Sequence, residues 1–259
     1  MKTRFQLSIA TALLLALPAT KAAAPRGVLI EARNFAYDAN YRNDQAGLRA
    51  AIAALEPLAK SLEEAAYANY YISWAYWALA GSQFQEKNAA GALESAKRAV
   101  AHARTGVAAR NTDPEFYSML ANAMISVAIM DPPHFKEVAT ELSGVRKKAL
   151  ELGPDSPRVV MMDAGMIFNN PPERGGGLEK GLARWLEAVK LFEAEADART
   201  ADPVAPRWGY ALAYGWLPDL YLRMNPPQKA QAREAAETAL RMRPDFWYVR
   251  EQVLPRLRE

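Results

Sequence analysis

Few residues in this chain could perform chemistry. His102 and His134 are its only histidines, and it contains no cysteine. His134 and Glu137 have the i, i+3 spacing of two ligands on one helix face, but two ligands alone do not make a metal site. The Gly-x-Ser-x-Gly and His-Glu-x-x-His motifs are absent. We therefore expect a non-enzymatic protein with no metal or cofactor, in which both histidines are solvated or cap helices.

A glycine run offers a second chemical hypothesis. Arg174-Gly175-Gly176-Gly177 precedes an expected helix N-terminus, where backbone N–H groups can bind phosphate. A phosphate-binding loop would follow a strand and end in Gly-Lys-Ser or Gly-Lys-Thr, whereas this run follows a predicted helix. We interpret it as a loop between two helices, with glycine at positions of positive φ.

Aromatic residues give the best indication of function. Tyr67, Tyr70, Trp74 and Trp77 occur at i, i+3, i+7 and i+10, which places them on one stripe of a helix. Rigid aromatic side chains on an open surface are good anchors for a partner or ligand. The alternative is that the stripe packs against the preceding helices as part of the core. A second, weaker set of candidates consists of Arg207, Tyr210 and Tyr214.

Small residues predict how the helices that carry these side chains are packed. Ala232, Ala236 and Ala239 lie at i, i+4 and i+7, and Pro244 follows five residues after the last of them. Such a stripe lets a helix pack closely on its neighbour, and the proline ends the helix. Related patterns occur at Arg146/Ala149/Pro154, Gly181/Trp185/Ala188, Ala46/Ala50/Ala53 and Ala92/Ala96/Ala99.

Caps, prolines and periodicity divide the chain into five helix pairs and a final helix. Asp113-Pro114-Glu115 is typical of a helix N-terminus. Double prolines at 132–133, 171–172 and 226–227 fall between the two helices of a pair. The predicted pairs are 28–40 with 44–58, 63–80 with 88–104, 114–130 with 134–152, 157–168 with 178–198, and 206–224 with 227–242, followed by a helix at 246–257.

These patterns resemble the tetratricopeptide repeat (TPR) family, whose unit is a helix pair of about 34 residues. The third pair matches with Tyr117, Leu120, Met124, Ala149 and Pro154. The fifth matches with Trp208, Ala211-Leu212 and its alanine stripe. The resemblance implies an all-α solenoid of about five antiparallel helix pairs plus a C-terminal helix. It further implies that the first helices line a concave groove that holds a protein or peptide partner.

A shorter segment suggests an alternative function. Residues 170–180 resemble a loop of exported TPR proteins associated with TRAP-type solute transporters. That resemblance implies a small-molecule-binding component of an uptake system, in which the aromatic stripe would stack on the ligand.

The N-terminus predicts export. Lys2 and Arg4 precede an apolar stretch at 9–17, which is shorter than the roughly 20 residues of a membrane span. We predict a signal peptide at 1–22 and a TPR-like domain at 23–259, in the periplasm or secreted; a retained anchor is the alternative. Removing 1–22 takes the formal charge from +3 to about 0, so we expect no nucleic-acid partner. Without cysteine there is no lipid anchor or disulfide.

Overall fold

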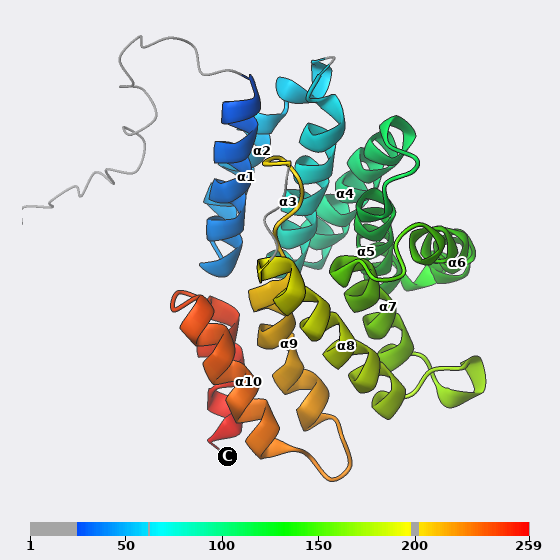
Figure 1. The fold of residues 1–259 in the computed structure, drawn as a ribbon, viewed down its shortest axis with the longest axis vertical. Coiled ribbons are helices and arrows are strands. Elements are labelled where there is room, and N and C mark those ends of the chain that lie inside the picture. Colours follow the sequence, from blue (N-terminus) through cyan, green and yellow to red (C-terminus); the bar gives the residue numbers. More distant parts are fainter. Residues whose placement is uncertain (1–24, 62, 198–201, 259) are drawn as a thin grey trace, which may run out of the picture.

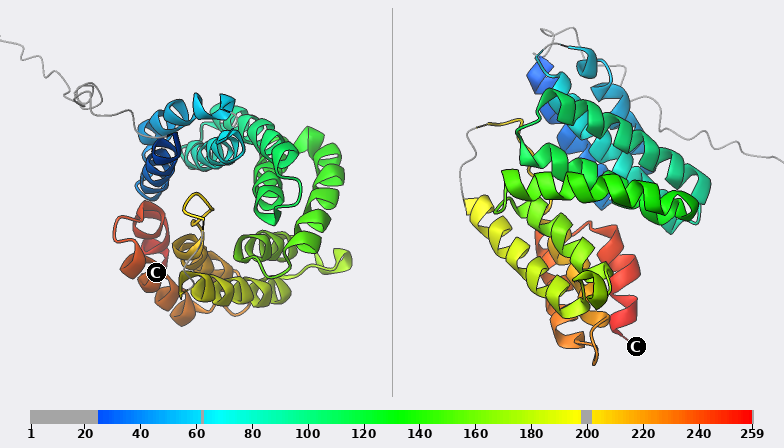
Figure 2. Two further views of the ribbon diagram at one scale, coloured as in Figure 1. Left: turned by 45° about the horizontal axis from the view of Figure 1, so that its top comes forward. Right: turned by 90° about the vertical axis from the view of Figure 1, so that its right-hand side faces the viewer.

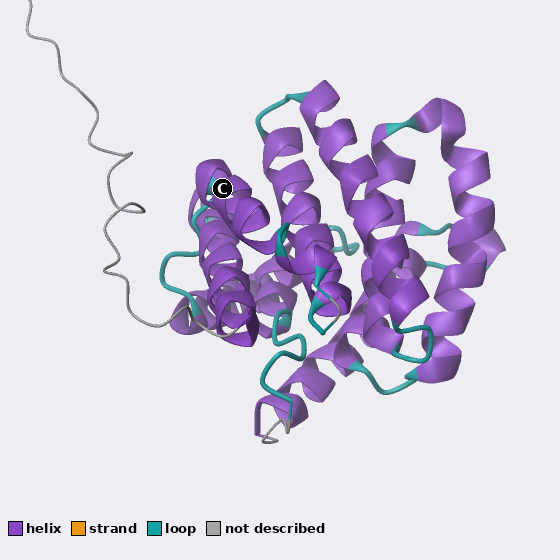
Figure 3. Ribbon diagram, turned by 90° about the horizontal axis from the view of Figure 1, so that it is seen from above, coloured by secondary structure: helices purple, strands orange, loops and turns teal. Residues whose placement is uncertain are grey.

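The computed structural model describes residues 25–61, 63–197 and 202–258. The predicted signal peptide at 1–22 lies outside the described residues. Within those residues the chain is helical and contains no strand, and short loops join the helix ends (Figure 3). The prediction of an all-α fold made of helix pairs is confirmed (Figure 1).

Within the described residues, ten α-helices form five consecutive pairs. Their bounds are α1 Pro25–Tyr41, α2 Gln45–Leu55, α3 Ala65–Gln85, α4 Ala89–Ala109, α5 Pro114–Met130, α6 Phe135–Leu152, α7 Pro157–Asn169, α8 Leu178–Asp197, α9 Tyr210–Leu222 and α10 Lys229–Met242. Short helical turns at Leu58–Lys60, Pro132–His134 and Pro172–Arg174 lie in the connections. The first two double prolines therefore fall between the helices of a pair in 3-10 turns, since proline cannot continue the first helix.

Local side chains explain where several helices begin. The Asp44 side chain accepts a hydrogen bond from the Gly47 N–H at 2.8 Å, and Asn88 caps α4 through Gly91 at 3.1 Å. Asp113 accepts from the Glu115 N–H, and α5 has the predicted bounds at both ends. Each cap satisfies a backbone donor that has no partner inside the helix.

Four predicted helices differ from the structure. Two of them, α3 and α4, end at Gln85 and Ala109, five residues beyond the predicted ends at 80 and 104. The first helix of the fifth pair was expected from residue 206, but the chain is non-helical until Gly209, whose φ is +120°. The final helix at 246–257 is instead a π-helix at Val249–Val253 followed by a 3-10 turn at Pro255–Leu257. Pro255 has no N–H to donate, so a regular α-helix cannot continue through it unchanged.

The small-residue stripes mark close helix contacts in all but one case. Ala232, Ala236 and Ala239 are fully buried, as are Ala149 and Ala188. Ala92, Ala96 and Ala99 are fully buried as well. The prediction for the first pair was wrong: Ala46 and Ala53 are exposed. There α2 turns its larger apolar face inward, through Leu48, Ile52 and Leu55, because those side chains remove more apolar surface from water than alanine does.

The helix pairs curve until the two ends of the array meet. Figure 2 shows the helices arranged as a ring, with the C-terminal elements beside α1. Arg243 joins them: its guanidinium lies 2.8 Å from Asp38 and stacks over the Tyr41 ring at 4.1 Å. Phe246 meets the Tyr41 ring edge-on at 5.0 Å. No helix within the described ranges has the length and apolar character that a membrane span requires.

Candidate functional site

The predicted aromatic stripe faces the inside of the ring, where the chain itself covers it. Tyr70 and Trp74 are 0% and 1% exposed, Tyr67 is 8% exposed, and Trp77 is half-buried. The cover is the connection between α8 and α9, residues 202–208, which enters the middle of the ring (Figure 2). Sequence analysis left two interpretations of the stripe, an open groove or packing in the core. In the structure the stripe is buried, against the preceding helix α1 through Tyr37 and against residues 202–208.

Side chains of the ring bind this connection through its backbone. Arg33 Nη1 donates to the carbonyls of residues 203 and 205, at 2.9 and 3.2 Å. The Tyr71 hydroxyl donates to the carbonyl of residue 204 at 2.5 Å. Arg158 Nη2 donates to the carbonyl of residue 206 at 2.9 Å. Four consecutive carbonyls are thus held by donors from three different helices, a mode of binding that does not depend on the side chains of the bound segment.

The stripe itself anchors the ends of the segment. Trp208 Nε1 donates to the Tyr70 hydroxyl at 2.7 Å, and its ring lies 6.1 Å from Trp74 and 5.8 Å from Trp77. At the other end, the Tyr67 hydroxyl donates to Asp202 at 3.2 Å. We call the stripe, with Arg33, Tyr71, Arg158 and Trp208, the inner cluster. Sequence analysis missed these last four as site residues, since nothing local links them to the stripe.

Arg158 is the charged centre of the inner cluster. Its side chain is 1% exposed and forms a two-pronged pair with Glu195 at 2.8 and 2.7 Å, and Glu115 lies at 3.4 Å. Burial opposes the charge, but the two carboxylates outweigh it and raise the pKa of Arg158. Burial also raises the pKa of Glu115, against the opposing effect of Arg158. The guanidinium therefore stays charged, and three of its N–H groups remain fixed, two on Glu195 and one on the segment.

The hydroxyls of Tyr70 and Tyr71 stay protonated and so remain available as both hydrogen-bond donors and acceptors. Burial raises the pKa of Tyr70 well above its usual value, and it raises that of Tyr71 to about 12. Both phenols are therefore protonated at neutral pH and can hydrogen-bond to a backbone carbonyl or an indole N–H.

Four buried polar atoms within the described residues have no hydrogen-bond partner, and all lie in or beside the inner cluster. They are the Tyr37 hydroxyl, Trp74 Nε1, Glu115 Oε2 and Arg158 Nε. Tyr37 touches Trp74, with ring centroids 4.6 Å apart. An unpaired buried polar group is costly, so such groups gather where a protein meets a ligand or a second polar partner.

The second predicted set does not join the stripe as one surface. Arg207 is exposed, while Tyr210 and Tyr214 pack against α8. Tyr210 stacks on Phe192 at 6.3 Å, and the Tyr214 hydroxyl donates to Glu193 at 2.9 Å. In this part of the sequence, the neighbouring Trp208 is the residue that contacts the aromatic stripe.

The histidines lie apart from each other and from the segment. His102 Nδ1 is 2.8 Å from the Asn69 amide oxygen, and burial lowers its pKa. His134 is exposed, and a hydrogen bond with Asp131 at 2.9 Å raises its pKa. Within the described ranges no three His, Cys, Asp or Glu side chains lie close enough to hold a metal ion. In the glycine run, Gly175 and Gly177 have φ of +80° and +131°, as a glycine-dependent loop requires.

Comparisons with known proteins identify the fold. No protein-family model and no curated protein matches the chain. Among solved structures, the HusA haemophore from Porphyromonas gingivalis superposes with a TM-score of 0.62 at 21% identity, covering 78% of this chain and 94% of that one. A thermophilic TPR protein from Thermus thermophilus gives 0.52 at 18% identity, covering 91% and 100%. The chain has a TPR-like fold.

Proposed function

We propose that this protein is a non-enzymatic, exported binding protein that holds a short segment of a protein or peptide partner on the inner surface of its ring. The observation that carries the proposal is the row of carbonyls at residues 203–206, each bound by a side chain of the ring. The bound backbone forms a turn, in which the Ala205 N–H donates to the Asp202 carbonyl at 3.2 Å. A surface that binds the carbonyls of one segment in this way has the donors to bind those of another. The partner's segment would displace residues 202–208 and take their place on the inner surface of the ring.

Two further observations support this proposal. The four unpaired polar atoms lie at the same inner surface, where a longer or differently placed peptide could satisfy them. The fold is also one in which stacked helix pairs create an extended binding surface. Export rests on the sequence of residues 1–22 and is tested by locating the protein in fractionated cells.

A synthetic copy of the segment tests the proposal. The probe is the fluorescein-labelled peptide Asp-Pro-Val-Ala-Pro-Arg-Trp, blocked at both termini, and the measurement is fluorescence anisotropy. The full chain carrying Trp208→Ala should bind it, because the peptide's tryptophan fills the vacated site beside Trp74 and Trp77. The wild type should bind it more weakly, since its tethered segment competes at an effective concentration of order 1 mM.

Controls separate binding from loss of structure. Trp216→Ala removes a tryptophan that is 42% exposed and remote from the inner cluster, and it should behave as the wild type. If Trp208→Ala does not retain its helical circular dichroism, Val204→Ala weakens the segment alone at a side chain that is 2% exposed. Absence of binding by a folded Trp208→Ala or Val204→Ala chain would refute the proposal.

The likeness to a haemophore favours a second candidate, a small-molecule carrier associated with an uptake system. Trp74, Trp77 and Trp208 lie within about 6 Å of one another, so a ligand at the inner surface would change their fluorescence. Titration with haem and a panel of metabolites tests this candidate. A saturable response that Trp216→Ala retains and Trp77→Phe diminishes would support it, and a flat response across the panel would refute it.

A further inference from the structure

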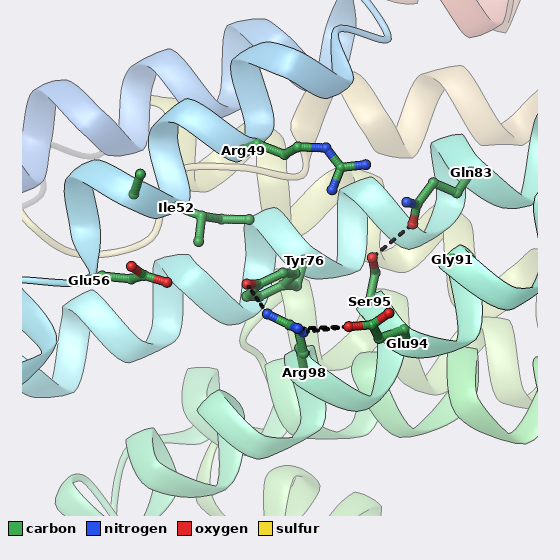
Figure 4. Close-up of a pocket in the computed structure, with 10 residues that line it drawn as sticks. Arg49, Ile52, Glu56, Tyr76, Gln83, Gly91, Glu94, Ser95 and Arg98 are labelled. Atoms are coloured by element: carbon green, nitrogen blue, oxygen red, sulfur yellow. Dashed lines mark hydrogen bonds and ion pairs between the residues drawn. The ribbon is translucent and has the colours of Figure 1, made fainter.

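A second, separate site lies on the other side of α3. Tyr76 and Gln83 project from the helix face opposite the aromatic stripe, as a rotation of about 100° per residue requires. There α2, α3 and α4 enclose a cleft of about 430 Å³ (Figure 4). This volume falls in the range of small-molecule sites, roughly 300–1,000 Å³. Nothing from residues 202–208 lines it.

The wall formed by α2 carries opposite charges at its two ends. Arg49, Ile52, Ala53 and Glu56 lie at i, i+3, i+4 and i+7, so they share one face of the helix. Figure 4 shows Glu56 at one end of the cleft and the Arg49 guanidinium between Ile52 and Gln83. Seven residues of helix separate their α-carbons by about 10.5 Å. Neither side chain forms an ion pair with another described residue.

The facing wall, formed by α4, is already neutral. Arg98 donates to Glu94 at 2.7 Å and to the Tyr76 hydroxyl at 3.3 Å. These two charges pair with each other, whereas Arg49 and Glu56 form no ion pair among the described residues. The cleft as a whole has two positive and two negative side chains. The net charge of a ligand therefore gives it no overall electrostatic attraction to the cleft.

The floor is polar although it is buried. Gln83 and Ser95 are 4% and 5% exposed, and Ser95 Oγ donates to the Gln83 amide oxygen at 2.8 Å. With the amide turned over, its nitrogen donates to the Gly91 carbonyl at 2.9 Å and its oxygen accepts from Arg49 at 3.2 Å. In this orientation the protein itself satisfies both ends of the amide. The Ser95 hydroxyl, which accepts from the Gln83 nitrogen at 2.8 Å, can then donate to a ligand such as a peptide carbonyl.

We propose that this cleft binds a short peptide with free termini, about three residues long. Its carboxylate pairs with Arg49 and its ammonium group with Glu56, while its peptide groups lie over Gln83, Ser95 and Tyr76. An extended chain covers about 3.3–3.6 Å per residue, so three residues span about the same length as the 10.5 Å between the α-carbons of Arg49 and Glu56. In a single amino acid, the ammonium and carboxylate groups are too close together to pair with both Glu56 and Arg49. A phosphate would meet Arg49 but leave Glu56 unpaired.

Isothermal titration of the full chain with trialanine tests this proposal. The wild type should bind trialanine, and trialanine blocked by acetylation and amidation should not bind. Arg49→Gln and Glu56→Gln should each weaken binding at least tenfold, because each removes one charged end of the site. Ala53→Trp, which fills the cleft without changing its charge, should abolish binding.

The matched control is Arg42→Gln, an exposed arginine outside the cleft, which should bind trialanine as the wild type does. No heat from the wild type up to about 10 mM trialanine, a limit set by the weakest measurable affinities, would overturn the proposal. Equal binding of the blocked and free peptides, or unchanged binding by both charge variants, would also overturn it. These results are independent of the inner-surface test, whose probe has blocked termini.

Discussion

Replacing Arg158 by methionine tests the physical account of the inner cluster. Methionine approximates the volume of the arginine stem but leaves three acceptors without their donor: Glu195, Glu115 and the carbonyl of residue 206. The Arg158 side chain is 1% exposed and its partners are 30% and 16% exposed. Removing one partner from such a pair leaves charge unpaired in a poorly hydrated site, which costs about 3–5 kcal/mol of the free energy of unfolding.

The expected change in melting temperature follows from the size of the chain. At roughly 2–4 °C per kcal/mol, Arg158→Met should melt about 6–20 °C below the wild type. The matched control is Arg104→Met, which removes an exposed pair with Glu141 at 2.7 Å. Exposed pairs contribute only about 0.2–1 kcal/mol, so that variant should melt within a few degrees of the wild type. Thermal unfolding followed by circular dichroism measures both.

The pH dependence separates lost charge pairing from lost packing. Burial already raises the pKa of Glu115, and Arg158 opposes that rise. Without Arg158 the folded-state pKa should rise further above the unfolded value, so the folded variant holds its proton more tightly than the unfolded chain does. The destabilisation should therefore shrink as pH falls from about 7 to about 5. Adding Glu115→Gln should recover part of the loss at neutral pH.

A melting temperature within about 2 °C of the wild type would refute this reasoning. So would a deficit that does not change with pH and is not reduced by Glu115→Gln. The first result would mean that the buried pair contributes no more than a surface pair, and the second that only the volume of the side chain matters.

Two further predictions concern packing and titration. Ala239 is 0% exposed, so Ala239→Leu should overpack the contact between α9 and α10 and lower the free energy of unfolding by about 1–3 kcal/mol, seen as a lower melting temperature. The control Ala230→Leu, on the exposed face, should change the melting temperature little. Equal melting temperatures of the two variants would contradict the assigned interface. NMR titration should give His102 a pKa below 6.5, because burial disfavours its charged form. It should give His134 a pKa above 6.5, because Asp131 stabilises the charged form of His134. The reverse order of the two pKa values would contradict the structure.

Helical periodicity suggests Ala235 as a control position for Ala239, but the structure excludes it. Ala235 lies about a third of a turn off the stripe of Ala232, Ala236 and Ala239, so periodicity alone predicts that it tolerates larger side chains better than Ala239 does. It is 4% exposed and buried as they are. The interface on α10 is therefore wider than the small-residue stripe, and Ala230 is the proper reference position.

The sequence by itself determined most of the helices, because their limits depend on interactions within a few residues. Asp113, Pro114 and the prolines after Asp131 fix α5 without help from the rest of the chain. The alanine stripes before Pro154 and Pro244 likewise identified close helix contacts and, through them, the TPR-like fold. Periodicity also showed correctly that Tyr67, Tyr70, Trp74 and Trp77 share one face of a helix.

The tertiary structure alone decided what covers that face. Pro206 has the local appearance of a helix start, yet the chain is not helical there, because Arg33, Tyr71 and Arg158 bind the carbonyls of residues 203–206 from up to 172 residues away. Helical periodicity states which side chains lie together but contains no information about a segment that far along the chain. The same limit applies to the cleft beside α3, whose walls come from three helices and whose free charges are visible only once their neighbours are in place.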